Sequence, residues 1–331
     1  MTSEVVYAPA EPAARRHLIA ISDLDRAGIE RLLTTAQSFE SVVEREVKKV
    51  PTLRGRTVVS IFFESSTRTA SSFELAAKRL SADTMSVKAV GSSVDKGESL
   101  KDTIQTLSAY GPDVVVIRHA NIGAAQLTTR YTTAHVVNAG DGKHQHPTQC
   151  LLDLYTIREA VGRLDGVNVA IVGDVLHSRV ARSNIQGFAA VGANVLLVGP
   201  PTLIPRGIEK TGVRVSSDIR DIRDADVVYV LRMQRERMAE GANFVPTLRE
   251  YAQRWGVTRD RVTPTQIVMH PGPMNRGVEI SADLADAAQS RILRQVQAGL
   301  VVRMAVLYDL VSRPYVDTPD YAAAAAEVAA R

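Results

Sequence analysis

Short apolar runs alternate with amphipathic segments along most of this chain. Four runs in the first half are rich in β-branched and aromatic residues and predict strands at 57–63, 84–90, 113–119 and 134–140. Between and after them, helices are expected at 71–80, 99–109, near 121–130 and from about Pro147. Strands joined through helices form a parallel sheet with right-handed crossovers, covered on both faces. The first half therefore predicts a doubly wound α/β domain.

The same alternation restarts after residues 161–166. Further strands are predicted at 167–174, 194–199, 226–231 and 266–270. A chain of 331 residues is also long for a single core. We therefore expect two doubly wound domains, each with a parallel β-sheet flanked by helices.

The two ends of the chain add helices to this scheme. Near the N-terminus, a helix preceded by Ser22 is predicted from apolar residues at helical spacing, which are Leu24, Ile29, Leu32, Leu33, Ala36, Phe39 and Val43. A long amphipathic helix at 286–311 is followed by no strand, so we expect it to pack back on the N-terminal domain. Residues 1–16 are expected to form a flexible arm.

Composition removes several classes of function. Cys150 is the only cysteine, so an internal disulfide or a thiolate metal cage cannot form, and a buried thiol is expected. Aromatic residues make up 5% of the chain and the basic residues are scattered, which argues against a nucleic-acid partner despite a net charge of +4. No apolar run approaches ~18 residues and no leader pattern opens the chain. We expect a cytoplasmic enzyme without a membrane partner.

The loops that follow the predicted strands carry the chemistry, because ligands of open parallel sheets bind beyond the carboxyl ends of the strands. After the first strand, the segment 64–69 (ESSTRT) combines hydroxyls, a helix start and a guanidinium, the ingredients of a phosphate cradle, although plain helix capping explains the hydroxyls equally well. Arg118 stands at the carboxyl end of the third strand. His146 and Gln149 follow the fourth, where a structural histidine is the competing interpretation. His144 and His146 lack the partners of a zinc site, so we expect no metal.

The second half repeats this arrangement with more arginine. Arg179 follows its first strand, Arg232 and Gln234 follow the strand that ends at Leu231, and the segment 270–273 (HPGP) follows the last one. The segment VGDVLHSR lacks the glycines of a dinucleotide fingerprint, so we expect no nicotinamide or other cofactor. One further loop, 91–98, is rich in glycine and serine and carries a single lysine, Lys96. Taken alone, it is typical of a solvated turn.

Together these segments resemble the aspartate carbamoyltransferase family of pyrimidine biosynthesis, from about residue 17 to 312. The matching motifs occur in the family's order and are Ser-Thr-Arg-Thr (66–69), Ser92 with Lys-Gly-Glu (96–98), Arg118-His119, His-Pro-Thr-Gln (146–149), Arg179, Arg-x-Gln (232–234) and His-Pro-x-Pro (270–273). The Lys-Gly-Glu loop and Arg-x-Gln separate aspartate enzymes from ornithine enzymes, which carry a cysteine where Pro271 stands here. Gly272 departs from the family, which often has a larger apolar residue at this position.

The resemblance implies a role for each motif residue. The phosphate of carbamoyl phosphate would be held by Ser66, Thr67, Arg68, Thr69 and Arg118, and Ser92 would also bind this substrate. The carbamoyl carbonyl would be polarised by Thr69, Arg118 and His146. Its NH2 group would be held by Gln149 and by the carbonyls of Gly272 and Pro273. L-Aspartate would be held by Lys96, Arg179, Arg232 and Gln234. The catalytic set would be Arg68, Thr69, Lys96, Arg118 and His146.

The resemblance also implies an organisation of the chain and its assembly. Residues 1–147 with 300–331 would form the carbamoyl-phosphate-binding domain, and 148–299 the aspartate-binding domain. Ser92 and Lys96 would enter the active site of a neighbouring subunit, which makes a homotrimer with shared sites. Whether a regulatory chain or a dihydroorotase extends the trimer to a hexamer or dodecamer stays open. No general base stands out among the matched residues, and the departing phosphate is one candidate for the proton acceptor.

Overall fold

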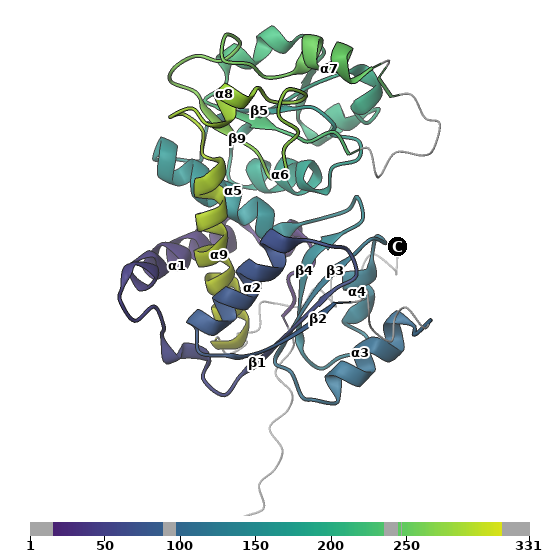
Figure 1. The fold of residues 1–331 in the computed structure, drawn as a ribbon, viewed down its shortest axis with the longest axis vertical. Coiled ribbons are helices and arrows are strands. Elements are labelled where there is room, and N and C mark those ends of the chain that lie inside the picture. The colour runs from purple at the N-terminus through teal and green to yellow at the C-terminus, as the bar shows by residue number, and fades with distance from the viewer. Residues whose placement is uncertain (1–15, 89–96, 235–243, 246, 313–331) are drawn as a thin grey trace, which may run out of the picture.

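The protein has two α/β domains, which form the lower and upper halves of Figure 1. The computed structural model describes residues 16–88, 97–234, 244–245 and 247–312. The lower domain contains a four-stranded parallel sheet in the order β2-β1-β3-β4. Its strands are β1 (Thr57–Phe62), β2 (Asp83–Lys88), β3 (Val114–His119) and β4 (His135–Asp141). The four strands predicted for the first half are all present.

The upper domain contains a five-stranded parallel sheet in the order β7-β6-β5-β8-β9. Its strands are β5 (Asn168–Val172), β6 (Asn194–Val198), β7 (Arg214–Ser216), β8 (Val227–Val230) and β9 (Ile267–Met269). Four of them confirm the predicted strands, and β7 was not predicted. Strand β7 is a three-residue edge strand with no buried residue, so it has neither the length nor the apolar pattern that identifies a strand.

Helices cover both sheets and join the two domains. They are α1 (Arg26–Glu44), α2 (Thr67–Arg79), α3 (Leu100–Ser108), α4 (Ala124–Thr128), α5 (Pro147–Val161), α6 (Arg179–Ala190), α7 (Leu248–Trp255), α8 (Ala282–Ala285) and α9 (Ile292–Ser312). Helix α5 leads from the lower domain into the upper one, and α9 returns to pack against α1 and α2 (Figure 1). The predicted return of the last long helix to the N-terminal domain is confirmed.

Alternate residues of a central strand face different cores, as the period of two in a strand requires. Val58 of β1 belongs to the large core under α1, α2 and α9. Its neighbour Val59 belongs to the core with Ile104 of α3 and Ala125 of α4. The large core continues through α5 into the upper domain, and Cys150 lies buried within it, as predicted. One continuous apolar core therefore fixes how the edges of the two sheets meet.

Three predicted boundaries are wrong for local reasons. Helix α2 begins at Thr67 and not at residue 71. Serine and threonine favour turns over helix interiors, so the hydroxyl-rich segment was predicted to be a loop, but it forms the first helical turn. The last helix begins at Ile292, since the short α8 and a turn precede it. Helix α1 is capped by Asp25, which accepts a hydrogen bond from the Gly28 N–H, and not by Ser22.

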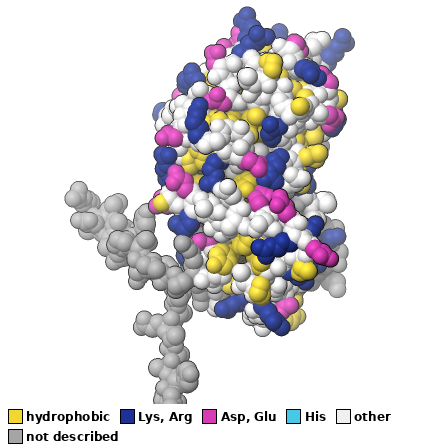
Figure 2. All heavy atoms as spheres, turned by 90° about the vertical axis from the view of Figure 1, so that its left-hand side faces the viewer, with side chains coloured by type: hydrophobic (Ala, Val, Ile, Leu, Met, Phe, Trp, Pro, Cys, Tyr) yellow, Lys and Arg dark blue, Asp and Glu magenta, His cyan; other side chains and the backbone are white. Residues whose placement is uncertain are grey.

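The surface shows no segregation of charge on the face drawn in Figure 2, where acidic and basic side chains are interspersed. Among the described residues, no helix is long and apolar enough to cross a membrane. The predicted N-terminal arm lies outside the described residues, except for Arg16.

Candidate active site

A cavity of about 260 Å³ opens where the carboxyl ends of the two sheets face each other. In the lower sheet, the chain turns to one side after β1 and to the other after β3, and these two strands are neighbours. In the upper sheet, β5 and β8 are related in the same way. Loops diverge at such switch points and leave a crevice. The cavity therefore lies where two crevices meet.

Most of the predicted site residues line this cavity. They are Ser66, Arg68, Thr69, Arg118, His146, Gln149, Arg179, Arg232, Gln234, Gly272 and Pro273. Thr67 is the second residue of the same phosphate motif but is not among the lining residues. Ser92 and Lys96 lie outside the described residues. The structure thus brings together loops from both domains that are separated by up to 207 positions in the sequence, from Ser66 to Pro273.

The phosphate motif stands at the N-terminus of α2. Ser66 is the N-cap residue, yet its side chain makes no capping hydrogen bond. The hydroxyl and the N–H groups of the first turn therefore remain available to an anion, and the helix dipole favours negative charge there. Thr69 is buried at the cavity wall. Capping alone, the competing interpretation of this motif, does not describe it.

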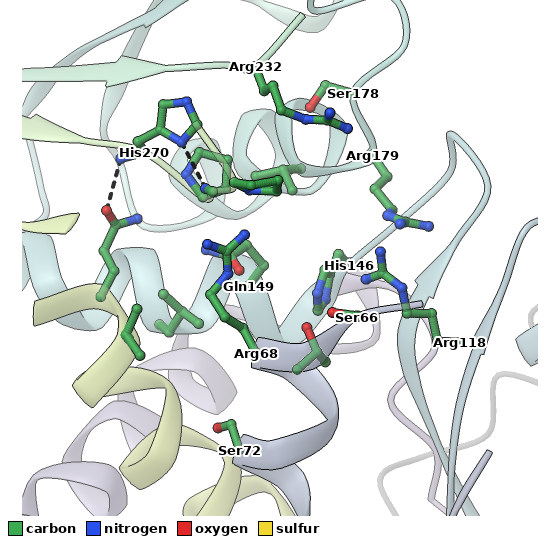
Figure 3. Close-up of a pocket in the computed structure, with 18 of the residues that line it drawn as sticks. Ser66, Arg68, Ser72, Arg118, His146, Gln149, Ser178, Arg179, Arg232 and His270 are labelled. Carbon is green, nitrogen blue, oxygen red and sulfur yellow. Dashed lines mark hydrogen bonds between the residues drawn. The ribbon is translucent and has the colours of Figure 1, made fainter. Parts of the chain in front are cut away.

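Arg68 reaches across the cavity towards the upper domain. A Cβ atom on Gly272 would lie 2.2 Å from Arg68 Nη1, so the guanidinium packs directly on the backbone of the 270–273 loop. Gly272 has φ +63°, a conformation that favours glycine. Burial lowers the pKa of Arg68, and repulsion from Arg232 lowers it further. The guanidinium groups of Arg68 and Arg232 thus face the same cavity from the two domains (Figure 3), in a place suited to an anion.

Glu64 joins the arginines of the two domains. It lies just beyond β1, and its Oε1 accepts a hydrogen bond from Arg118 Nη2 at 2.6 Å. The same carboxylate pairs with Arg179, whose Nη1 lies 3.1 Å from Glu64 Oε2. Arg179 also donates to the carbonyl of Gly142 at 3.3 Å, and Arg118 to that of Ala139 at 3.2 Å. Both side chains are therefore fixed in position before any ligand binds.

The start of α5 supplies the uncharged polar groups. Pro147 occupies the first helical position, as predicted, and His146 is the buried N-cap residue. The backbone N–H of His146 donates to Ser183 Oγ of α6 at 2.8 Å, which ties this helix start to the upper domain. Gln149 follows in the first turn and lines the cavity. The imidazole of His146 and the amide of Gln149 therefore both line the cavity.

Arg232 and Gln234, which follow β8, line the cavity on the side of the upper domain. Arg232 Nη2 donates to Gln234 Oε1 at 3.3 Å. The backbone N–H of Gln234 donates to Asp174 Oδ2 at 3.1 Å, and Asp174 is fully buried and also accepts from His177. The buried carboxylate anchors the loop after β8 to the loop after β5. The side chains of Arg232 and Gln234 are therefore kept at the rim of the cavity.

The 270–273 loop closes the site. His270 is buried, and its Nδ1 accepts the Gly272 N–H at 2.8 Å, which places the ring proton on Nε2, 3.4 Å from Glu279 Oε1. Burial lowers the pKa of His270 although Glu279 opposes this shift. A neutral His270 thus shapes the turn that presents the backbone of Gly272 and Pro273 to the cavity.

The charges of the described lining residues decide the class of ligand. Five arginines and one carboxylate, Glu64, line the cavity. Figure 3 shows Arg68 and Arg118 below Arg179 and Arg232, and the fifth arginine is Arg303 of α9. Guanidinium groups bind carboxylates and phosphates through two parallel hydrogen bonds. The described residues contain no cluster of three or more His, Cys, Asp or Glu suited to a metal. The site is built for anions that carry at least two charged groups.

Comparison with known proteins agrees with this chemistry. Residues 16–159 match the family model described as the carbamoyl-phosphate-binding domain of aspartate/ornithine carbamoyltransferases, and residues 165–310 match the Asp/Orn-binding domain. The chain belongs to the aspartate/ornithine carbamoyltransferase family. The match covers nearly the whole region in which the sequence motifs occur.

Three individual relatives of this carbamoyltransferase are all aspartate enzymes. An aspartate carbamoyltransferase catalytic subunit from Pelotomaculum thermopropionicum is 56% identical over 297 residues, covering 88% of this chain and 96% of the relative. One from Frankia casuarinae is 55% identical over 297 residues, with 88% and 93% covered. A structure of aspartate transcarbamoylase from Trypanosoma cruzi with aspartate and phosphate superposes with a TM-score of 0.81 at 31% identity, covering 90% of this chain and 98% of that one.

Several lining residues of this carbamoyltransferase had no role in the sequence interpretation. They are Glu64, Ser72, Ser178, Gln295 and Arg303. Glu64 directly follows a strand, and that position is a usable signal. Gln295 and Arg303 are polar residues buried in the apolar helix α9, eight positions apart and so on one helix face. A pair of buried polar residues on one face of a predicted helix would have pointed to a site.

Proposed function

We propose that this chain transfers the carbamoyl group of carbamoyl phosphate to the amino group of L-aspartate. The products are N-carbamoyl-L-aspartate and phosphate, and the reaction is the second step of de novo UMP synthesis. The observation that carries the proposal is the convergence of five arginines from two domains on one cavity, in a chain of this family. A dianionic donor and a dicarboxylate acceptor together need such a set of cations.

The donor is assigned to the lower wall of the cavity. Its phosphate binds Ser66, Thr67, Arg68, Thr69 and Arg118, where the first turn of α2 offers N–H groups. Its carbonyl oxygen receives hydrogen bonds from Thr69, Arg118 and His146. Its NH2 group donates to Gln149 and to the carbonyls of Gly272 and Pro273. All of these residues except Thr67 line the cavity, and hydrogen bonds fix Arg118 and the backbone of His146, which supports this assignment.

The acceptor is assigned to the upper wall, where Arg179, Arg232 and Gln234 bind the two carboxylates of aspartate. Its amine attacks the carbamoyl carbon, negative charge grows on the carbonyl oxygen, and the C–O bond to phosphate breaks. Fixed donors at that oxygen each contribute about 3 kcal/mol to lowering the barrier. The only carboxylate among the described lining residues, Glu64, is engaged by Arg118 and Arg179, so the departing phosphate takes the amine proton.

The domain roles and the assembly belong to the same proposal. Residues 1–147 with 300–331 bind carbamoyl phosphate, and 148–299 bind aspartate; the packing of α9 against α1 and α2 supports this division. The protein acts in the cytoplasm as a homotrimer in which Ser92 and Lys96 complete the site of a neighbouring subunit. Light scattering should give about three times the chain mass of 35.9 kDa. The measurement is repeated after a regulatory chain or a dihydroorotase is added. A mass that increases only in the presence of one of these chains would identify it as a partner in a larger assembly.

One assay tests the reaction itself. Purified protein is supplied with carbamoyl phosphate and either L-aspartate or L-ornithine, and the carbamoylated product is measured. We expect product with aspartate alone, because the upper wall would repel the side-chain ammonium of ornithine. Calorimetry with a phosphonoacetyl-aspartate mimic should show one tight site per chain. A preference for ornithine, or no binding of the mimic, overturns the proposal.

A further inference from the structure

A buried carboxylate, Asp153, lies one helical turn below Gln149 and is fully enclosed. Its Oδ1 accepts hydrogen bonds from Gln149 Nε2 at 3.0 Å and from Gln295 Nε2 at 2.8 Å. Its Oδ2 accepts from Asn184 Nδ2 at 3.0 Å and from Tyr229 Oη at 2.7 Å. The four donors come from α5, α9, α6 and β8, so this one group joins elements of both domains.

Such a group is costly to keep in a protein core. No ion pair to Asp153 is found in the described part of the chain, and burial raises its pKa to about 6, although the four hydrogen bonds lower it. The other titratable or charged groups that sense it are Tyr229, Cys150 and Arg303. An apolar residue of similar size usually gives a more stable core than a buried charge. The carboxylate therefore calls for a functional explanation.

The first consequence concerns the orientation of Gln149. A carboxylate oxygen can only accept from this side chain, so the amide NH2 faces Asp153. The amide oxygen, Oε1, is then the atom that Gln149 offers to a ligand in the cavity that it lines. Without this constraint the amide could turn over and present a donor instead. Asp153 thus makes Gln149 an acceptor.

The second consequence concerns the 270–273 loop. Gln295 gives its NH2 to Asp153, which leaves its Oε1 to accept the backbone N–H of His270 at 2.9 Å, the bond dashed in Figure 3. His270 Nδ1 in turn accepts the Gly272 N–H. A chain of directed hydrogen bonds therefore runs from Asp153 to the loop whose carbonyls also face the cavity.

We propose that Asp153 is a positioning residue that aligns the acceptors for the carbamoyl NH2 and so selects a carbamoyl donor over an acetyl donor. The inference rests on the proposed function. Acetyl phosphate has a methyl group where carbamoyl phosphate has NH2, and it is otherwise similar in size and charge. Buried acceptors that face a methyl group stay unpaired, which penalises the analogue. Inorganic phosphate carries neither group and reports on the phosphate cradle alone.

The test compares Asp153→Asn with the wild-type protein. An asparagine places its NH2 group against one pair of donors, either Gln149 and Gln295 or Asn184 and Tyr229, and a neutral amide oxygen against the other pair. In either orientation Gln149 loses its hydrogen bond to a charged oxygen, so its amide is held less firmly. We measure the dissociation constants of carbamoyl phosphate, acetyl phosphate and inorganic phosphate by calorimetry. The preference for carbamoyl over acetyl phosphate should fall about tenfold, or about 1.4 kcal/mol. The affinity for inorganic phosphate should change little.

Two further variants test whether the effect is specific to Asp153 and to the hydrogen bonds that it makes. Asp309→Asn is the matched control. It changes a mostly buried carboxylate on α9 that pairs with Arg16 and Arg31 away from the cavity, and it should leave the donor preference unchanged. If Asp153→Asn does not fold, Gln295→Met interrupts only the branch to His270 and should lower the preference in the same direction. An unchanged preference, or equal weakening of all three ligands, overturns the inference. Wild-type protein that lacks carbamoyl transfer would instead refute the proposed function.

Discussion

Replacing Arg179 by glutamine should weaken the binding of aspartate far more than the binding of carbamoyl phosphate. Arg179 is 3% exposed and holds Glu64 from the upper domain, so it is already oriented and desolvated for a carboxylate. A hydrogen bond to a charged group contributes about 1.5–3 kcal/mol, and a bidentate pair about twice that, which equals roughly 10²- to 10⁴-fold in affinity. Aspartate must share or displace Glu64, and this exchange reduces the gain. We therefore expect the lower end, an aspartate KM raised about 10²-fold.

Steady-state kinetics and calorimetry together check this prediction. The carbamoyl phosphate Kd should rise far less than the aspartate KM, because the donor binds the lower wall. Arg220→Gln is the matched control, since Arg220 is an exposed arginine of the same domain that pairs with Asp218. Its aspartate KM should equal that of the wild type. An equal loss of affinity for both substrates in Arg179→Gln would refute the division of the cavity into two walls.

Three other outcomes are expected. Arg68→Ala should abolish turnover with an unchanged thermal unfolding profile, and near-normal rates would contradict the phosphate cradle. Mixing inactive Lys96→Ala chains with inactive Arg68→Ala chains should restore part of the activity after verified subunit exchange, and no recovery would argue against shared sites. The raised pKa of Asp153, about 6 against 3.8, means that its stabilising contribution is complete below pH 3.8 and is lost as pH rises through 6. Urea unfolding should therefore show the stability of wild type relative to Asp153→Asn falling by about 2 kcal/mol between pH 4 and pH 7, and a constant difference would contradict the buried ionisation.

The sequence predicted the site well where one loop carries its own chemical signature. The run Ser66 to Thr69 opens a helix with hydroxyls and a guanidinium, and Arg118 stands at the carboxyl end of a strand of the same sheet, so both fall at one edge of the sheet. Glu64 was visible in the same loop, but its role was not, because that role depends on Arg179 from the other domain. No local pattern specifies a contact between residues 115 positions apart.

Local propensity and period decided the elements of this protein. Apolar runs of strand length, helical spacing and a proline at a helix start are read within a few residues, and they give two parallel sheets with reactive loops at their carboxyl ends. Long-range packing decided how these pieces meet. The continuous core through α5 and α9 sets the two sheet edges face to face, gathers five arginines around one cavity and buries Asp153 beneath Gln149. These features depend on distance in space between residues far apart in the chain, which only the folded structure fixes.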